Sequence, residues 1–278
     1  MNKVYQIVTD KILEKLDEGT IPWRKPWDMQ DPVNWITQKP YRGMNYILLP
    51  GGEYLTWNQV QKNKGKVKKG STAEIVIFWK MWTPPDERQK DSEEEEIKQI
   101  PLLRYYKVFH IDDIEGIESK QRDKERKHNP IEEAEEIIQG FLEREDFQVK
   151  FKGGRASYSP SEDFVQVPPI NDFEDPQAYY STMFHELAHA TKHKDRCNRD
   201  DSYAYEELTA EIAAAMLSNI VGIEQTLDNT ASYIDHWRNQ ISKDPKLIVK
   251  ASAKAQKAVE YILGKERVEE KEKETAVA

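Results

Sequence analysis

Hydrophobic residues in the N-terminal segment recur at the spacing of one helical face. Val4, Val8, Ile12 and Leu16 are separated mostly by polar and charged residues, and Gly19 follows as a stop signal. Apolar positions four residues apart lie on one side of an α-helix. The pattern therefore predicts an amphipathic helix that buries this face.

Two later segments, residues 73–82 (AEIVIFWKMW) and 102–111 (LLRYYKVFHI), are rich in β-branched and aromatic residues. This composition predicts two paired strands. Before them, Thr56 and Gly65 bracket a short predicted helix as its N-cap and its C-terminal stop. Residues 84–99, between the two strands, are strongly acidic and predict a mobile insertion.

The second half of the chain has mostly helical patterns. Asp175 and Pro176 make a strong helix start, as N-cap and first helical residue. Helices are predicted over 131–145, 176–194, 205–222, 228–242 and 245–264. Strands are predicted over 147–151, 156–159 and 163–169. We expect the last of these strands to offer an open edge to an extended peptide.

These patterns indicate an α+β protein of two domains, a small α+β N-terminal domain and a mainly helical C-terminal domain with a short β-sheet. Residues 116–130 are charged and lack apolar periodicity, so we place a linker there, between domains at 1–115 and 131–264. The charged tail, 265–278, is expected to be disordered. A length of 278 residues agrees with two domains.

Charge is distributed unevenly along the chain. The net charge is −9, yet residues 1–82 hold 13 basic and 8 acidic residues and six of the seven tryptophans. Two regions with different surfaces suggest two functions. No apolar run approaches the ~20 residues that span a bilayer. We therefore expect no membrane partner. Cys197 is the only cysteine, so no internal disulfide is possible and we expect a cytoplasmic protein.

A short motif in the second half predicts a metal site. His185 and His189, in the sequence HELAH, lie one turn apart on the same helical face, so both imidazoles can reach one cation. Glu186 points about 100° away from His185 around the helix axis. Its carboxylate can therefore act as a general base beside the metal without binding it.

The third ligand should come from another element, because catalytic zinc takes three protein ligands and keeps one position for water. The predicted helix at 205–222 carries Glu206, Glu207 and Glu211 among apolar residues, where carboxylates need partners. Glu207 and Glu211 share a face. We assign Glu207 as a metal ligand. We expect Glu211 to accept a hydrogen bond from the free ring N–H of His185.

Such a site would hydrolyse peptide bonds by metal-bound water, with Glu186 as the general base and Zn²⁺ as the metal, and with Mn²⁺ as an alternative. Two other interpretations stay open. The histidines and glutamates could be ordinary helix-face residues, or the metal could be bound without catalysis. No residue is identified as the oxyanion stabiliser, and His193 and Tyr205 are candidates only by their positions in the sequence.

Cations alternate with flat aromatic side chains in the N-terminal half, a composition typical of surfaces that bind single-stranded nucleic acid. The candidate residues are Trp23, Arg24, Lys25, Trp27, Asn34, Lys39, Tyr41, Arg42, Asn45, Lys66, Lys68 and Lys69. In the alternative interpretation the tryptophans form the core of a small domain, the lysines form its solvated rim and the asparagines hold loops. For Trp79 and Trp82 we expect core or cross-strand packing.

Longer motifs in both halves resemble the ArdC-type antirestriction family. They are LDEGTIPWRKPW, NWITQKPYRGMNYILL, YLTWNQVQKNKGKVKKGSTAEIVIFW and YYKVFHIDDIEG in the first half, and HELAHAT, CNRD and YAYEELTAEIAAAMLSNIVGI in the second. The resemblance implies a single-stranded-DNA-binding domain followed by a zincin-like metallopeptidase domain. HELAH with a second helix of the form Glu-x-x-x-acid also resembles the gluzincins. That resemblance implies Glu207 as third ligand, Glu211 as supporting acid and Glu206 as a solvent-side neighbour.

The expected function is that of an antirestriction protein of a plasmid or phage, which binds single-stranded DNA and cleaves an unidentified protein substrate. The alternative is a DNA-coating protein with a structural or vestigial metal site. A DNA mimic that acts through the acidic run is disfavoured, because mimics are acidic throughout and this chain is not. The sequence leaves the oligomeric state open.

Overall fold

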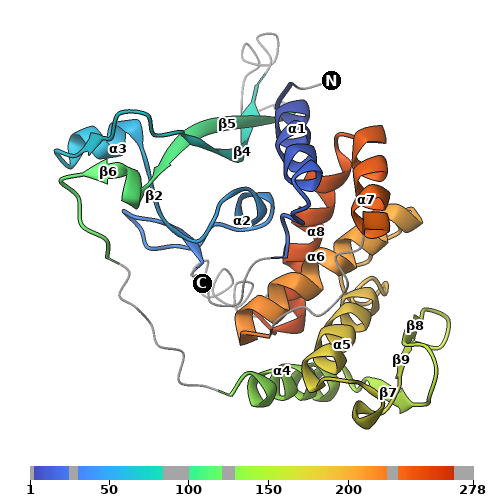
Figure 1. The fold of residues 1–278 in the computed structure, drawn as a ribbon. Helices are drawn as coiled ribbons and strands as arrows, with labels where there is room; N and C mark the ends of the chain where they lie inside the picture. Colours follow the sequence, from blue (N-terminus) through green and yellow to red (C-terminus); the bar gives the residue numbers. More distant parts are fainter. Residues whose placement is uncertain (1–2, 25–30, 84–99, 121–128, 224–230, 266–278) are drawn as a thin grey trace, which may run out of the picture.

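The computed structural model describes residues 3–24, 31–83, 100–120, 129–223 and 231–265. Lys25, Trp27 and the acidic run 84–99 lie outside these residues, as do most of the predicted linker and nearly all of the predicted tail. Within the described ranges, no helix combines the length and the apolar character needed to cross a membrane. Figure 1 shows the arrangement of the elements.

The N-terminal half is built around a four-stranded sheet of order β1-β2-β5-β4, in which β1 is parallel to β2 and the other neighbours are antiparallel. A second, two-stranded sheet pairs β3 with β6. The elements are α1 (Lys3–Asp17), β1 (Pro32–Asn34), α2 (Met44–Leu48), β2 (Gly52–Thr56), α3 (Trp57–Lys62), β3 (Lys66–Val67), β4 (Glu74–Trp82), β5 (Ile100–His110), the 3-10 helix η2 (Ile111–Asp113) and β6 (Ile114–Glu115).

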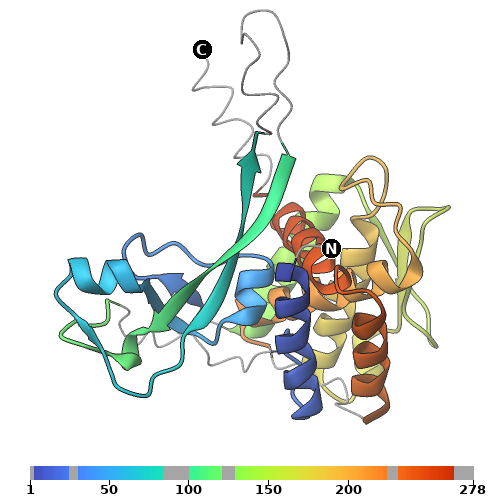
Figure 2. The ribbon, with the colours of Figure 1, turned by 90° about the horizontal axis from the view of Figure 1, so that it is seen from above.

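Strands β4 and β5 pair along their length, as predicted, and we call this pair the β4–β5 ribbon. At its base, Ile75, Ile77 and Leu103 are buried in the main core. Its far end projects beyond the helices, as Figure 2 shows. Trp79 is 53% exposed, so it is not a core residue, but it pairs across the ribbon with the buried Leu103, and the cross-strand alternative is confirmed.

The described part of the C-terminal half places five α-helices beside a small sheet. Its elements are α4 (Pro130–Glu145), β7 (Gln148–Phe151), β8 (Ser157–Ser159), β9 (Phe164–Val167), the 3-10 helix η3 (Ile170–Asp172), α5 (Pro176–Ala190), α6 (Tyr203–Val221), α7 (Ala231–Lys243) and α8 (Leu247–Ile262). The strand order is β7-β9-β8, so β9 is paired on both sides. The expectation of an open edge at 163–169 is therefore wrong, and β8 and β7 are the edges.

Local signals explain where several helices begin and end. The Thr56 side chain accepts a hydrogen bond from the Gln59 N–H at the start of α3, and the Gln59 side chain accepts one from the Thr56 N–H. Asp175 accepts a bond from Gln177 N–H at 2.8 Å, ahead of Pro176. Gly222 ends α6 with a φ of 77°, which side chains with a Cβ rarely adopt. These three predictions are confirmed.

One hydrophobic core joins the two halves. Val8 and Ile12 on α1 are buried in the same cluster as Ile248 on α8, and Trp23 meets Trp237 on α7 edge-on with ring centroids 6.3 Å apart. The predicted apolar face of α1 is therefore buried, and part of its cover comes from the C-terminal helices. Figure 2 shows α1 beside α7.

Candidate metal centre

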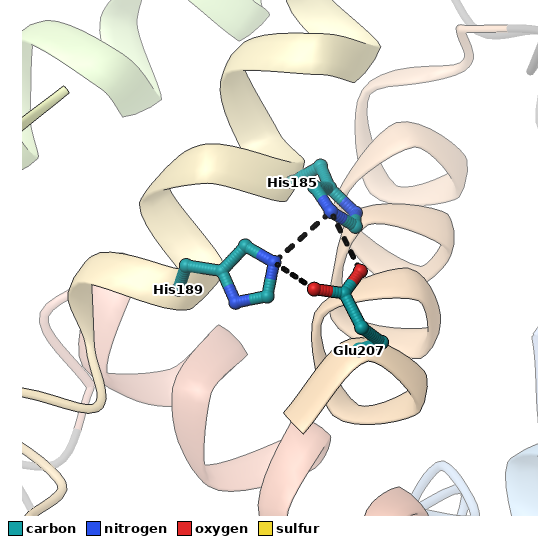
Figure 3. A group of neighbouring side chains, drawn as sticks. All are labelled: His185, His189 and Glu207. Carbon is teal, nitrogen blue, oxygen red and sulfur yellow. Dashed lines mark hydrogen bonds and ion pairs between the residues drawn. The ribbon is translucent and has the colours of Figure 1, made fainter. Parts of the chain in front are cut away.

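Helices α5 and α6 pack against each other. Both helices carry fully buried small residues, Ala188 on α5 and Ala210 and Ala213 on α6. Because the two helices are in contact, longer polar residues of both can reach the same point in space. His185 and His189 come to that point from α5, and Glu207 comes from α6 (Figure 3).

The three side chains converge through the atoms that bind metals. His189 Nε2 lies 3.1 Å from His185 Nε2 and 3.5 Å from Glu207 Oε1. His185 Nε2 lies 3.8 Å from Glu207 Oε2. The ligand atoms of the three residues all lie within 4.8 Å of one another, and no other such cluster is found in the described part of the chain.

This donor set fits a small divalent metal. Ligands at 2.0–2.2 Å from a tetrahedral ion are about 3.4 Å apart, which is close to the separations seen here. Two imidazoles and one carboxylate are also the ligands found in many catalytic zinc sites, where the fourth position stays open. Burial and the adjacent His189 lower the pKa of His185, so its imidazole is neutral and its lone pair is available.

A buried chain of contacts orients His189. The Nδ1 of His189 lies 3.2 Å from Glu206 Oε1, and Arg199 donates to both oxygens of that carboxylate at 2.9 Å and 3.1 Å. Arg199 also donates to the Ala188 carbonyl and to Thr191 Oγ1. Burial alone would raise the pKa of Glu206, but the bonds from His189 and Arg199 outweigh it and hold that pKa below its ordinary value. The ionised carboxylate fixes the tautomer of His189 that leaves Nε2 free for a metal.

Two expectations for the glutamates need correction. Glu206 is only 5% exposed and supports a histidine, so it is not a solvent-side neighbour. Glu211 contacts the N-terminal half instead of His185: Arg24 Nη2 lies 3.6 Å from Glu211 Oε2. Residues 206 and 211 point to different sides of α6, and Arg24 reaches the side that Glu211 faces.

Glu186 lies beside the three ligands, in a largely buried position. Burial raises the pKa of its carboxyl group, and Glu207 adds to the rise, while His189 and a hydrogen bond from the backbone N–H of Tyr158 oppose it. A carboxylate with a raised pKa accepts a proton more readily at neutral pH, which suits a general base. Tyr158 belongs to β8, so the edge strand of the small sheet runs beside Glu186.

The two residues considered for oxyanion stabilisation have other partners. The hydroxyl of Tyr205 donates to Asp244 at 2.5 Å, at the end of α7. His193 follows α5, and its Nδ1 lies 3.5 Å from the carboxylate of Asp195. Neither side chain joins the cluster of ligands. Arg199 and Tyr158 are functional candidates that we did not single out from the sequence, although Arg199 stands in the quoted motif CNRD.

The predicted nucleic-acid residues divide into buried and exposed sets. Trp23 is 1% exposed, and the Arg24 guanidinium is buried between Glu211 and the ring of Tyr233 at 4.5 Å. These two side chains cannot stack on bases or contact phosphates, so their prediction is wrong. They hold the two halves of the protein together, which a local sequence pattern does not reveal.

Asparagines and some cations have structural partners as well. Asn45 exchanges two hydrogen bonds with the backbone of Ile77, and the side-chain Oδ1 of Asn34 accepts from the N–H groups of Ile36 and Thr37. Arg42 pairs with Glu260 on α8, and Lys68 donates to the Asp112 carbonyl at 2.6 Å. Lys39, Lys66 and Lys69 are exposed, and Tyr41 is half-buried.

Comparisons with known families match both halves. A family model described as the N-terminal domain of anti-restriction factor ArdC matches residues 2–109. A model described as a zincin-like metallopeptidase matches residues 133–254, which include all four residues of the candidate centre.

Among curated proteins, two DNA primases TraC of Escherichia coli are 30% and 29% identical to this chain over 95% and 99% of its length. The chain spans only 20% and 28% of those primases. The uncharacterized protein y4eC of Sinorhizobium fredii is 29% identical, with 93% of this chain and 91% of y4eC covered.

Two crystal structures of the antirestriction protein ArdC from plasmid R388, one metal-free and one with bound Mn(II), match with a TM-score of 0.73. The metal-free structure is 32% identical and the match covers 95% of this chain and 98% of that protein. The Mn(II)-bound structure is 31% identical, with 94% and 97% covered. Both domain types, in the same order and over nearly the full length, are thus shared, and the chain belongs to the ArdC antirestriction family.

Proposed function

We propose that this protein binds single-stranded DNA through its N-terminal half and hydrolyses peptide bonds with a divalent metal held by His185, His189 and Glu207. The observation that carries the peptidase proposal is the convergence of these three ligands with Glu186 beside them. The donor set favours Zn²⁺. Mn²⁺ is the second metal to test, because the related R388 protein has been crystallised with Mn(II).

When bound, the metal supplies a Lewis acid that makes water more acidic and polarises a carbonyl group. Glu186 takes a proton from the attacking water and later donates it to the leaving amine. Glu206 and Arg199 keep His189 in the orientation and tautomer that binding requires. Three protein ligands would leave one coordination position of a tetrahedral metal for water and substrate.

Strand β8 supports a mode of peptide binding. It is an edge strand, and the backbone N–H of Tyr158 meets Glu186. An extended peptide that lies along this edge would place its carbonyl groups beside the general base and the metal ligands. The proposed substrate is therefore an unfolded or loop segment of a protein.

The DNA-binding part of the proposal rests on the N-terminal match and on the composition of that half. Exposed aromatic rings favour unpaired bases over a duplex, in which base faces are hidden. DNA binding would bring the peptidase close to proteins that act on entering DNA. Restriction enzymes of the host are one such class.

The substitution Glu186→Gln tests the peptidase. It preserves side-chain size and all three ligands but removes the base, so metal content should stay at the wild-type level. Cleavage of casein or of a host-protein extract should fall at least ~100-fold. Glu136→Gln, at an exposed position of α4, is the matched control and should cleave normally.

Wild-type cleavage rates in Glu186→Gln would refute the role of this residue. Metal binding by the wild type without any cleavage would favour the alternative, a protective DNA-binding protein with a non-catalytic metal site.

A further inference from the structure

The β4–β5 ribbon displays an unusual set of exposed side chains. Residues on a strand alternate between its two faces, and directly paired residues of neighbouring strands share a face. The register pairs Val76 with Tyr106 and Phe78 with Arg104. Tyr106, Phe78, Arg104 and, two positions on, Lys80 therefore lie on one face, which we call the Phe78–Tyr106 face.

The aromatic rings of this face are accessible and adjacent. Phe78 is 40% exposed and Tyr106 is 37% exposed, and their ring centroids are 5.6 Å apart. Large apolar side chains normally avoid such exposure unless a partner covers them. The two rings are tilted by 54° to each other, so each ring can offer a separate apolar face to a base.

The charge of the ribbon selects the kind of partner. The Phe78–Tyr106 face carries two cations, Lys80 and Arg104. Glu74, the one acidic residue of the two strands, lies at the base of this face and pairs with Lys11 at 2.8 Å. Lys80 and Arg104 are exposed. A second copy of the chain docked face to face would bring these cations against their own counterparts, which is unfavourable. A polyanion with flat apolar groups would satisfy both the rings and the cations.

The base of this face meets residues that the sequence already marked for DNA binding. Tyr106 lies against Tyr41, and Tyr41 lies against Asn34. Lys39, two residues before Tyr41, is exposed. The surface thus continues from the ribbon onto the loop that follows β1.

We infer that the Phe78–Tyr106 face is the platform on which unpaired bases of single-stranded DNA stack, while Lys80 and Arg104 contact the phosphates. This inference deepens the proposed DNA-binding function and rests on it. Aromatic stacking tolerates any base, so binding through this face has little sequence preference.

The test uses the full-length protein and a fluorescein-labelled oligothymidine, with affinity measured by anisotropy at several KCl concentrations. The double substitution Phe78→Ala/Tyr106→Ala should weaken binding by about 5- to 150-fold, the loss expected for one stacked base, without changing the salt dependence. Lys80→Ala/Arg104→Ala should weaken binding and reduce the slope of log K against log [KCl] by about 1.4, because each phosphate contact contributes about 0.7.

Trp57→Ala is the matched control. Trp57 is 52% exposed on α3, against Phe109 at the other end of β5, and its removal should leave binding unchanged. All substituted positions are on the surface, and a thermal melt of each variant confirms that it is folded.

Wild-type affinity in Phe78→Ala/Tyr106→Ala would overturn this inference and leave the proposed function standing, with DNA held elsewhere. No binding by the wild-type protein would overturn both. A double variant that changes only the sedimentation coefficient, and not DNA affinity, would identify the face as a self-association surface and would also overturn the inference.

Discussion

Glu206 and Glu207 are neighbours on α6 but have different roles, because successive helical residues point about 100° apart. Glu207 faces the two imidazole Nε2 atoms, while Glu206 faces His189 Nδ1 and Arg199. One carboxylate can bind the metal and the other can set the tautomer of the histidine that binds it.

At this scale we predict that Glu206→Gln lowers metal affinity by about 10–100-fold, because the neutral amide holds the His189 N–H less strongly and leaves Arg199 without its counter-charge. A competition titration against a metal chelator measures the effect. Glu136→Gln should retain wild-type affinity. Equal affinities for the wild type and Glu206→Gln would show that this contact does not tune the site.

Residue spacing was sufficient to anticipate the grouping of His185, His189 and Glu207, since helical geometry fixes which side chains share a face. It was not sufficient for Glu211. A helical face can meet any element that packs on it, and the partner of Glu211 is Arg24, from the far end of the chain. Such long-range pairing leaves no periodic trace in the sequence.

At the scale of elements, an ion pair ties the β8–β9 turn to the end of α5. Arg196 donates to both oxygens of Asp163 at 2.8 Å, and the Tyr158 hydroxyl donates to Asp163 at 2.8 Å. Arg196 also donates to the Ala190 carbonyl, the last residue of α5. These bonds hold β8 at the distance from which Tyr158 N–H reaches Glu186.

The ion pair predicts an acid-dependent loss of stability. Burial alone would raise the pKa of Asp163, but the bonds from Arg196 and Tyr158 outweigh it and hold the pKa below its ordinary value. The native carboxylate therefore binds a proton less readily than the unfolded one. Its stabilising contribution is complete above the unfolded pKa of about 3.9 and is lost as the pH falls further.

Asp163→Asn tests this contribution and keeps a residue that tolerates the positive φ of 51° at this position. We expect the free energy of unfolding at pH 7 to fall by about 1–2 kcal/mol, a modest value because the carboxylate is partly exposed. Urea unfolding between pH 7 and pH 3 should show a weaker pH dependence in the variant. Parallel curves for both proteins would contradict the assignment.

The existence of most strands could be predicted, but their order could not. The three strands of the small sheet have similar alternating patterns, so these patterns do not identify which strand is central. The same limit applies to Trp79: composition identified its strand, whereas its exposure depends on where the covering helices stop.

At the scale of the whole molecule, the segment Ile21–Arg24 enters the helical half. Trp23 packs against Trp237, and Arg24 pairs with Glu211. We predict that Trp23→Ala costs about 3–5 kcal/mol. Because the core is continuous, urea unfolding should remain one transition at lower midpoint when followed by circular dichroism and by limited proteolysis.

Two separate transitions, with the one for the C-terminal half unchanged from the wild type, would contradict a shared core. Trp57→Ala, at an exposed tryptophan, should leave the midpoint unaltered. The segregation of charge predicted two regions in this chain, and it gave no information on how they associate. The pattern of an amphipathic helix indicates that one of its faces is buried. It does not identify the element that packs against that face.

The apolar interface that α1 and Trp23 form with the C-terminal helices has a consequence for the evolution of such proteins. A recombination event that replaced one half with a foreign sequence would expose large apolar surfaces to water on both halves. The N-terminal and C-terminal halves are therefore expected to be inherited together, and new combinations require compensating changes on both sides of this interface.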